Sequence, residues 1–377
     1  MAILHLDDLA DAATTKRLVV KVGSALLVGS DGQPRREWLA GLIEEVAEMA
    51  ARGQQVVIVS SGAIALGAAR MGLAKGGRAS LADAQAAASV GQIALAGLWS
   101  ALLQDRGLGA AQMLVTLGDL EDRRRYLNAA STLGRLLEAG FVPVVNENDS
   151  VATEEIRFGD NDRLAARVAQ AAGADAVLLL SDVDGLFDRN PAHNGAVLIP
   201  HVDGINDEIR AMADAGSASG MGSGGMTSKL QAAEIAERAG IALAIINGTR
   251  QRPISAAIAA GLGTVFRTQR RDAGRKAWLG GRLDVRGRLT VDDGCSAALL
   301  TGSSLLAAGI CAVDGAFSRG DVVAVCDGAG KTVAQGLAEY SADECRAIMG
   351  MREAAQHRQL GYAPRPAVIH RDHLVVL

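Results

Sequence analysis

Short apolar runs alternate with longer amphipathic stretches through the first 268 residues. The runs at 17–22, 55–60, 111–117, 141–146, 176–181 and 243–247 are almost continuously apolar, which predicts strands buried on both faces of a sheet. The stretches at 38–53, 81–107, 126–140 and 162–175 repeat apolar residues at helical spacing, and several end near glycine. This alternation predicts an α/β fold with an open, mostly parallel sheet sandwiched by helices.

The pattern changes near residue 272. From Trp278 onward, short strand-like runs are separated by Asp-Gly and Arg-Gly turns, as in a small β-rich domain. The chain of 377 residues is long enough for two domains. We therefore expect one domain over residues 14–268 and a second over 276–371.

Composition supports two packed cores. Hydrophobic residues make up 49% of the chain and charged residues 21%, so a sizeable core is available. Aromatic residues are only 3%, so the core must consist of Val, Ile, Leu and Ala. The net charge of -4 argues against a dedicated nucleic-acid binder.

The first 17 residues are acidic and lack an apolar core, so they are not typical of a secretory signal. The most apolar window, 81–103, contains Asp83, Gln85 and Gln92, which favours a packed helix over a membrane span. We expect a cytoplasmic protein. None of the four cysteines forms a CxxC pair, and the six histidines show no metal-ligand spacing, which predicts reduced thiols and no protein-held metal.

Polar loops follow four of the predicted strands. They begin at Lys21, at Ser60, at Asn146 and at Ser181. A fifth loop, GSGGMTSK at 222–229, precedes a helix. Since parallel strands bring their carboxyl ends to one edge of a sheet, we expect these loops to form one ligand site.

The glycine-rich segment 220–229 has two interpretations. Gly220, Gly222 and Gly225 satisfy GxGxxG, but a helix-like stretch precedes them, so the dinucleotide fingerprint does not apply. The segment also lacks the spacing of a Walker A loop. Backbone N–H groups that lead into a helix, with Lys229 in its first turn, suit phosphate oxygens. A mobile linker is the alternative.

These motifs, in this order, resemble the amino acid kinase family, and within it the glutamate 5-kinases. The resemblance covers nearly the whole chain. Its most specific signal is NEND at 146–149 followed by GDND at 159–162. The tail from residue 303 is similar to a PUA domain. The other supporting motifs are VVKVGSALL (19–27), VIVSSGAIALG (57–67), SDVDGLF (181–187) and SGMGSGGMTSKLQAA (219–233).

The resemblance implies ATP-dependent phosphorylation of the side-chain carboxylate of L-glutamate to L-glutamyl 5-phosphate, the first step of proline biosynthesis. It implies that Lys21 and Lys229 contact the transferring phosphoryl group and that Asp162 orients both lysines. Mg²⁺ would arrive with ATP. The implied glutamate ligands are Ser61, Asp149, Asn161 and Asn146. The implied ATP site consists of Lys21, Gly23, Ser181, Asp182, Ser223, Gly224, Gly225, Met226, Thr227, Ser228 and Lys229.

Two alternatives stay open at this point. One is a related kinase that acts on N-acetylglutamate, carbamate or a nucleotide monophosphate. The other is RNA binding through the PUA-like tail, which is disfavoured because residues 277–377 hold ten Lys and Arg against eleven Asp and Glu. The resemblance further implies feedback inhibition by L-proline, a homo-oligomer (dimer or tetramer), and transfer of the product to glutamyl phosphate reductase.

Overall fold

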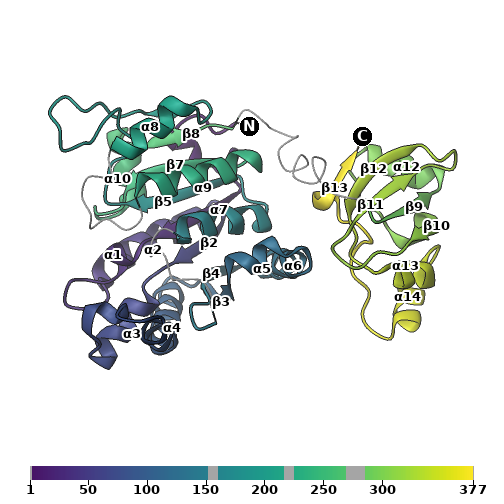
Figure 1. Cartoon of the computed structure of the whole chain (residues 1–377), viewed down its shortest axis with the longest axis horizontal. Coiled ribbons are helices and arrows are strands. Elements are labelled where there is room, and N and C mark those ends of the chain that lie inside the picture. Colours follow the sequence, from purple (N-terminus) through teal and green to yellow (C-terminus); the bar gives the residue numbers. More distant parts are fainter. Residues whose placement is uncertain (1, 152–159, 216–224, 269–284, 377) are drawn as a thin grey trace. The chain divides into compact units, whose positions relative to one another are not determined.

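The computed structural model describes residues 2–151, 160–215, 225–268 and 285–376, which fold as two compact units (Figure 1). The first is an α/β unit and the second is β-rich. The predicted fold class is therefore confirmed. The predicted domain limits, 14–268 and 276–371, stay a prediction.

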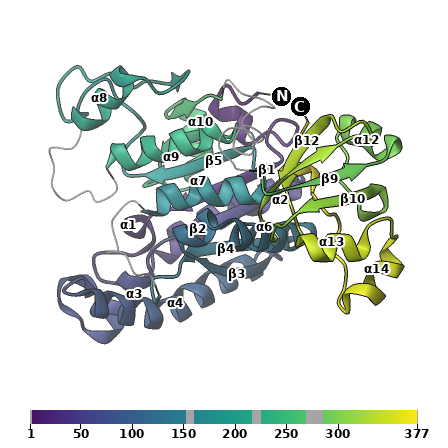
Figure 2. The ribbon, with the colours of Figure 1, turned by 45° about the vertical axis from the view of Figure 1, so that its right-hand side comes forward.

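The α/β unit is built on an eight-stranded sheet with the order β3-β4-β2-β1-β5-β7-β8-β6. Figure 2 labels the first five of these strands, β3 to β5. The six predicted strands are present, and they run parallel. The short strands β6 (His201–Val202) and β8 (Thr264–Phe266) were not predicted, and β8 is antiparallel to β7. The parallel strands are β1 (Arg17–Val22), β2 (Gln55–Ser60), β3 (Gly109–Val115), β4 (Phe141–Glu147), β5 (Ala176–Ser181) and β7 (Ala242–Asn247).

The predicted strand at 111–117 is wrong at its carboxyl end. Strand β3 stops at Val115, and Leu117 begins helix α5 (Leu117–Glu121). The cause is local, because the N–H and hydroxyl of Thr116 donate to the Asp119 carboxylate at 2.7 and 2.8 Å. The Asp119 N–H donates back to the Thr116 hydroxyl at 3.1 Å. Thr116 thus caps a helix where its apolar neighbours resemble a strand.

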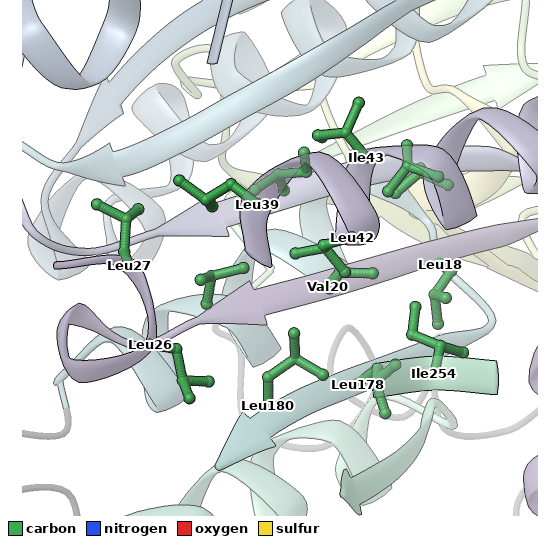
Figure 3. Packing of buried hydrophobic residues seen from close by; sticks show 14 of the residues in the cluster. Leu18, Val20, Leu26, Leu27, Leu39, Leu42, Ile43, Leu178, Leu180 and Ile254 are labelled. Atoms are coloured by element: carbon green, nitrogen blue, oxygen red, sulfur yellow. The ribbon is translucent and has the colours of Figure 1, made fainter. Parts of the chain in front are cut away.

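Alternation along β1 decides which of its side chains face the site. Leu18, Val20 and Val22 pack into one large core with helix α2 (Arg36–Ala51), whereas Lys21 belongs to the opposite face. Figure 3 shows this core, which also contains Leu178 and Leu180 of β5. The further helices of this unit are α1 (Ser24–Leu27), α3 (Ala63–Met71), α4 (Leu81–Gln104), α7 (Asp160–Ala172), α8 (Asp207–Ala215), α9 (Met226–Arg238) and α10 (Pro253–Ala260). Helix α6 (Arg123–Glu138) belongs to this unit from Ala129 onward.

Helices α3 and α4 cross at a pair of glycines. A Cβ on Gly67 would lie 1.8 Å from the carbonyl oxygen of Ala87, and a Cβ on Gly91 would lie 1.8 Å from that of Ala63. The two backbones therefore touch, and no side chain fits at either position. Within the described ranges, α4 is the one helix long and apolar enough to cross a bilayer by length and composition alone, and 44% of its apolar window is buried.

The β-rich unit has a five-stranded sheet with the order β10-β9-β11-β12-β13. Strands β9 and β11 pair in parallel and the other neighbours are antiparallel. Tyr340 is buried in its core, and all four cysteines of the chain lie in this unit as free thiols. Its elements are β9 (Gly287–Val291), α12 (Asp293–Leu300), β10 (Ile310–Gly315), β11 (Val322–Cys326), β12 (Thr332–Leu337), α13 (Ala342–Ile348), α14 (Glu353–Leu360) and β13 (Leu374–Val376).

Candidate active site

A buried cluster of three charges lies at the carboxyl edge of the sheet. Lys21 Nζ is 2.6 Å from one oxygen of Asp162, and Lys229 Nζ is 3.2 Å from the other. Asp162 is fully buried, and the two lysines are only 8% and 6% exposed. The carboxylate therefore joins β1, α7 and α9, three elements that are distant in sequence.

The electrostatics of this cluster favour an anionic ligand. Burial alone would raise the pKa of Asp162, but the ammonium groups of Lys21 and Lys229 outweigh burial, and the pKa is lowered. Two ammonium groups against one carboxylate give these three side chains a net charge of +1. Lys229 also lies in the first turn of the 13-residue helix α9, where backbone N–H groups favour negative charge.

A second group of polar side chains adjoins the first through the sequence neighbour of Asp162. The Asn161 amide nitrogen donates to the Ser61 hydroxyl and, at 3.5 Å, to the Ser60 carbonyl oxygen. Asn161 Oδ1 is buried and is one of the few such oxygens in the described residues that have no hydrogen-bond partner. A buried acceptor of this kind needs a donor, which a ligand with an N–H group would supply.

The NEND residues are held by α4 and by the segment that precedes it. The Asn146 amide nitrogen donates to Gln92 Oε1 at 2.9 Å, and Asn146 is 2% exposed. Asp149 follows β4 and acts electrostatically on Arg78: burial lowers the pKa of the Arg78 guanidinium, and the Asp149 carboxylate opposes that change. The Asp149 carboxylate of this loop therefore interacts electrostatically with the Arg78 guanidinium.

The predicted ATP residues are only partly covered by the described structure. Ser181 ends β5, is buried, and donates from its hydroxyl to Asp182 at 3.2 Å. The Ser228 hydroxyl lies 3.0 Å from an Asp162 oxygen and 3.0 Å from the Gly225 carbonyl oxygen. Gly225 is the N-cap of α9, whose first residues are Met226 and Thr227. Ser223 and Gly224 lie outside the described residues.

Gly23 also lies at the cluster, because a Cβ there would be 3.7 Å from Lys21 Nζ. The structure therefore brings together Lys21, Asp162, Lys229 and Ser228 in one group and Ser61 with Asn161 in another.

Three polar residues near the site were missed in the sequence. Gln92 and Trp99 project from α4, where the Trp99 indole N–H donates to the Ser60 hydroxyl at 2.9 Å. Asn247 ends β7 beside Ser181 and donates to Asp184 at 3.0 Å. Asn247 could have been predicted, because it is a polar residue at the carboxyl end of a parallel strand, like those that begin the other loops. Gln92 and Trp99 lie within a helix, where no sequence pattern marks them.

Comparison with known proteins identifies the family. A model of the amino acid kinase family matches residues 16–247, which include the charge cluster and both NEND and GDND. The chain belongs to the amino acid kinase family. A model of the PUA domain matches residues 287–360, so the β-rich unit of this amino acid kinase is a PUA domain.

Several curated relatives match this amino acid kinase along nearly its whole length. A protein of Novosphingobium aromaticivorans named glutamate 5-kinase is 65% identical over 377 residues, covering 100% of both chains. One of Sphingopyxis alaskensis with the same name is 61% identical and covers 97% of this chain and 98% of its own. A third, from Zymomonas mobilis, is 52% identical, with 96% and 91% covered. The predicted resemblance is confirmed, and the roles of single residues stay predictions.

Proposed function

We propose that this chain transfers the terminal phosphoryl group of ATP to the side-chain carboxylate of L-glutamate, which yields ADP and L-glutamyl 5-phosphate. The observation that carries the proposal is the buried cluster of Lys21, Asp162 and Lys229, which has a surplus of positive charge at the edge where the sheet binds ligands. Full-length relatives named glutamate 5-kinase support the choice of glutamate as the acceptor.

The acceptor needs no general base. A glutamate carboxylate has a pKa of about 4.3 and is ionised at pH 7, so its oxygen can attack phosphorus directly. The obstacle is the repulsion between an anionic nucleophile and an anionic phosphate. Catalysis then consists of positioning and charge neutralisation. Lys21 and Lys229 supply the positive charge, and Asp162 fixes both ammonium groups before the phosphate arrives.

The amino acid is proposed to bind next to this cluster. Ser61 and Asn161 already contact each other, and the unpartnered Asn161 Oδ1 offers an acceptor to the substrate ammonium group. Asp149 supplies the negative charge that the ammonium group requires in a partly buried loop. Asn146 contributes a carboxamide from the end of β4.

ATP is proposed to lie across the ends of β5 and α9, at Ser181, Asp182 and residues 223–229, with Gly23 beside Lys21. Mg²⁺ fits this arrangement only as a companion of ATP. Asp162 is already engaged by two lysines, and no three His, Cys, Asp or Glu side chains converge anywhere in the described ranges. When bound, the ion would draw charge from the phosphate oxygens, and its remaining ligands would be waters.

The decisive experiment traps the acyl phosphate. The purified chain is incubated with Mg-ATP, L-glutamate and hydroxylamine, and glutamyl hydroxamate is measured. We expect glutamate-dependent product, and a loss of about 10²–10³ in kcat for Lys21→Ala and for Lys229→Ala. Lys16→Ala, which removes an exposed lysine one residue before β1, is the matched control and should retain full activity. A loss under fivefold in both site variants would refute the assigned roles.

The same assay separates the main alternative. Acetylation removes the positive charge of the amino group, so Asp149 would face a neutral amide. N-acetylglutamate should therefore react much more slowly than glutamate. Faster turnover of N-acetylglutamate, carbamate or a nucleotide monophosphate would show that the phosphoryl acceptor is not glutamate but the substrate of a related kinase of the family.

The wider biology is proposed on the resemblance. The reaction would be the first step of proline biosynthesis in the cytoplasm, with L-proline as feedback inhibitor. The chain would act as a homo-oligomer, dimer or tetramer, and would deliver its labile product to glutamyl phosphate reductase. The balance of ten basic and eleven acidic residues over 277–377 disfavours RNA binding by the PUA domain.

A further inference from the structure

Helix α4 contacts the proposed glutamate site although none of its residues belongs to a strand-end loop. Gln92 Oε1 accepts a hydrogen bond of 2.9 Å from the Asn146 amide nitrogen. Asn146 is 2% exposed, so water cannot easily replace this partner. Gln92 directly follows Gly91, whose backbone touches α3. The backbone position of Gln92 is therefore fixed by the crossing of two helices.

The contact determines how the Asn146 carboxamide is turned. A carboxamide presents an acceptor oxygen on one side and a donor nitrogen on the other. The Gln92 oxygen accepts from the Asn146 nitrogen, so in the structure the Asn146 NH₂ group faces α4. The Asn146 oxygen is then presented on the opposite side. Without Gln92, the amide could rotate by half a turn and exchange the two groups.

A second contact from the same helix supports the neighbouring loop. Trp99 lies seven residues after Gln92, which is two turns further along the same face of α4, about 10 Å away. Its indole N–H donates to the Ser60 hydroxyl at 2.9 Å, and that hydroxyl donates to the Ser61 carbonyl oxygen at 3.1 Å. Helix α4 thus holds both the Asn146 loop and the Ser61 loop from one side.

We propose that Gln92 is a positioning residue for the acidic amino-acid substrate, which acts through Asn146 and sets the affinity for the amino acid without taking part in phosphoryl transfer. This inference rests on the proposed function. It concerns the amino-acid side of the site only, since Gln92 contacts Asn146, whereas Lys21 and Lys229 are held by Asp162.

The test compares three variants of the full-length protein in the hydroxamate assay. Gln92→Met removes the acceptor at similar size, Gln92→Glu keeps an acceptor oxygen there, and Gln104→Met makes the first change at the exposed end of the same helix. A net hydrogen bond of about 1 kcal/mol corresponds to about fivefold in binding. We expect Gln92→Met to raise the KM for glutamate about fivefold to tenfold.

The kcat and the KM for ATP should stay within about twofold, because an interaction lost equally from ground and transition states changes KM alone. Gln92→Glu should restore at least part of the glutamate affinity, and Gln104→Met should match the unmodified chain. A merely structural role would instead lower the melting temperature and affect both substrates.

Two results would overturn the inference. If the unmodified chain is active on glutamate and Gln92→Met has an unchanged KM for glutamate, or raises both KM values together, Gln92 does not position the amino acid. If the unmodified chain forms no glutamyl hydroxamate, the proposed function fails, and this inference fails with it.

Discussion

Replacing Asp162 by Asn tests whether one carboxylate holds the site together. The substitution keeps the size of the side chain and removes its charge. Lys21 and Lys229 are 8% and 6% exposed, so both ammonium groups would remain buried without their shared counter-ion. They would repel each other and lose contacts that are now 2.6 and 3.2 Å long.

Because both ion pairs are buried, the expected loss of stability is large. Removing one partner of a buried ion pair costs about 3–5 kcal/mol, because the remaining charge is left uncompensated. For a unit of this size, each kcal/mol lowers the melting temperature by about 2–4 °C, so Asp162→Asn should lower it by about 6–20 °C. Activity should fall by about 10²–10³ as well, because neither lysine would be held in place.

Differential scanning calorimetry in phosphate-free buffer measures the first effect, and the hydroxamate assay measures the second. Asp207→Asn is the control, since it breaks an exposed ion pair with Arg210 on α8 and should leave the melting temperature within about 2 °C. Inorganic phosphate should recover part of the stability of Asp162→Asn, because it would neutralise the lysines in the folded state only. A melting temperature of Asp162→Asn close to that of the unmodified chain would refute the reasoning.

The stability that Asp162 contributes should depend on pH. The folded pKa of Asp162 lies below its ordinary value of about 3.9, because two ammonium groups outweigh burial. Its stabilising contribution is therefore complete above about pH 4 and is lost as the pH falls through the lower folded pKa. The difference in melting temperature between the unmodified chain and Asp162→Asn should be constant from pH 5 to pH 7 and should shrink below about pH 4.

Two further predictions concern packing and thiol reactivity. Gly91→Ala should destabilise the α/β unit by about 1–3 kcal/mol or more, because the new Cβ would lie 1.8 Å from a backbone oxygen of α3. Gly97→Ala is the control, since a Cβ at that position of the same helix meets no atom within 4 Å. Equal melting temperatures of the two variants would contradict the close crossing. A disulfide reagent at pH 8 should react first with exposed Cys311, since burial raises the pKa of Cys295 to about 11 and that of Cys345 to about 12. A fast phase that persists in Cys311→Ser would contradict this order.

The sheet could be predicted from the sequence because its central strands are long and apolar. Six parallel strands followed from uninterrupted β-branched runs, and the convergence of their polar ends followed from the topology. Strands β6 and β8 have two and three residues, which is too short to show a period. Leu117 was predicted to lie in a strand because its neighbours are apolar. The Thr116–Asp119 hydrogen bonds that begin the helix are not evident from a single threonine in an apolar run.

The site was predictable only where its residues end strands or open helices. Lys21 was found in that way, but its contact with Asp162 came from the family resemblance, since 140 residues separate them. Gln92 and Trp99 could not be found, because polar residues within an apolar helix carry no sign of what they contact. Their partners are decided by the crossing at Gly67 and Gly91, which is a property of the folded state.

The adjacency of Asn161 and Asp162 on α7 has a geometric consequence. One of these residues contacts the loop proposed for the amino acid, and the other holds the two lysines proposed for the phosphate. Their Cα atoms are separated by a single peptide unit, about 3.8 Å, which cannot stretch. This peptide would therefore keep a constant spacing between the residue proposed for the amino acid and the residue that holds the two lysines. A tilt of α7 would carry both binding groups together, so the gap that the phosphoryl group must cross would keep its length.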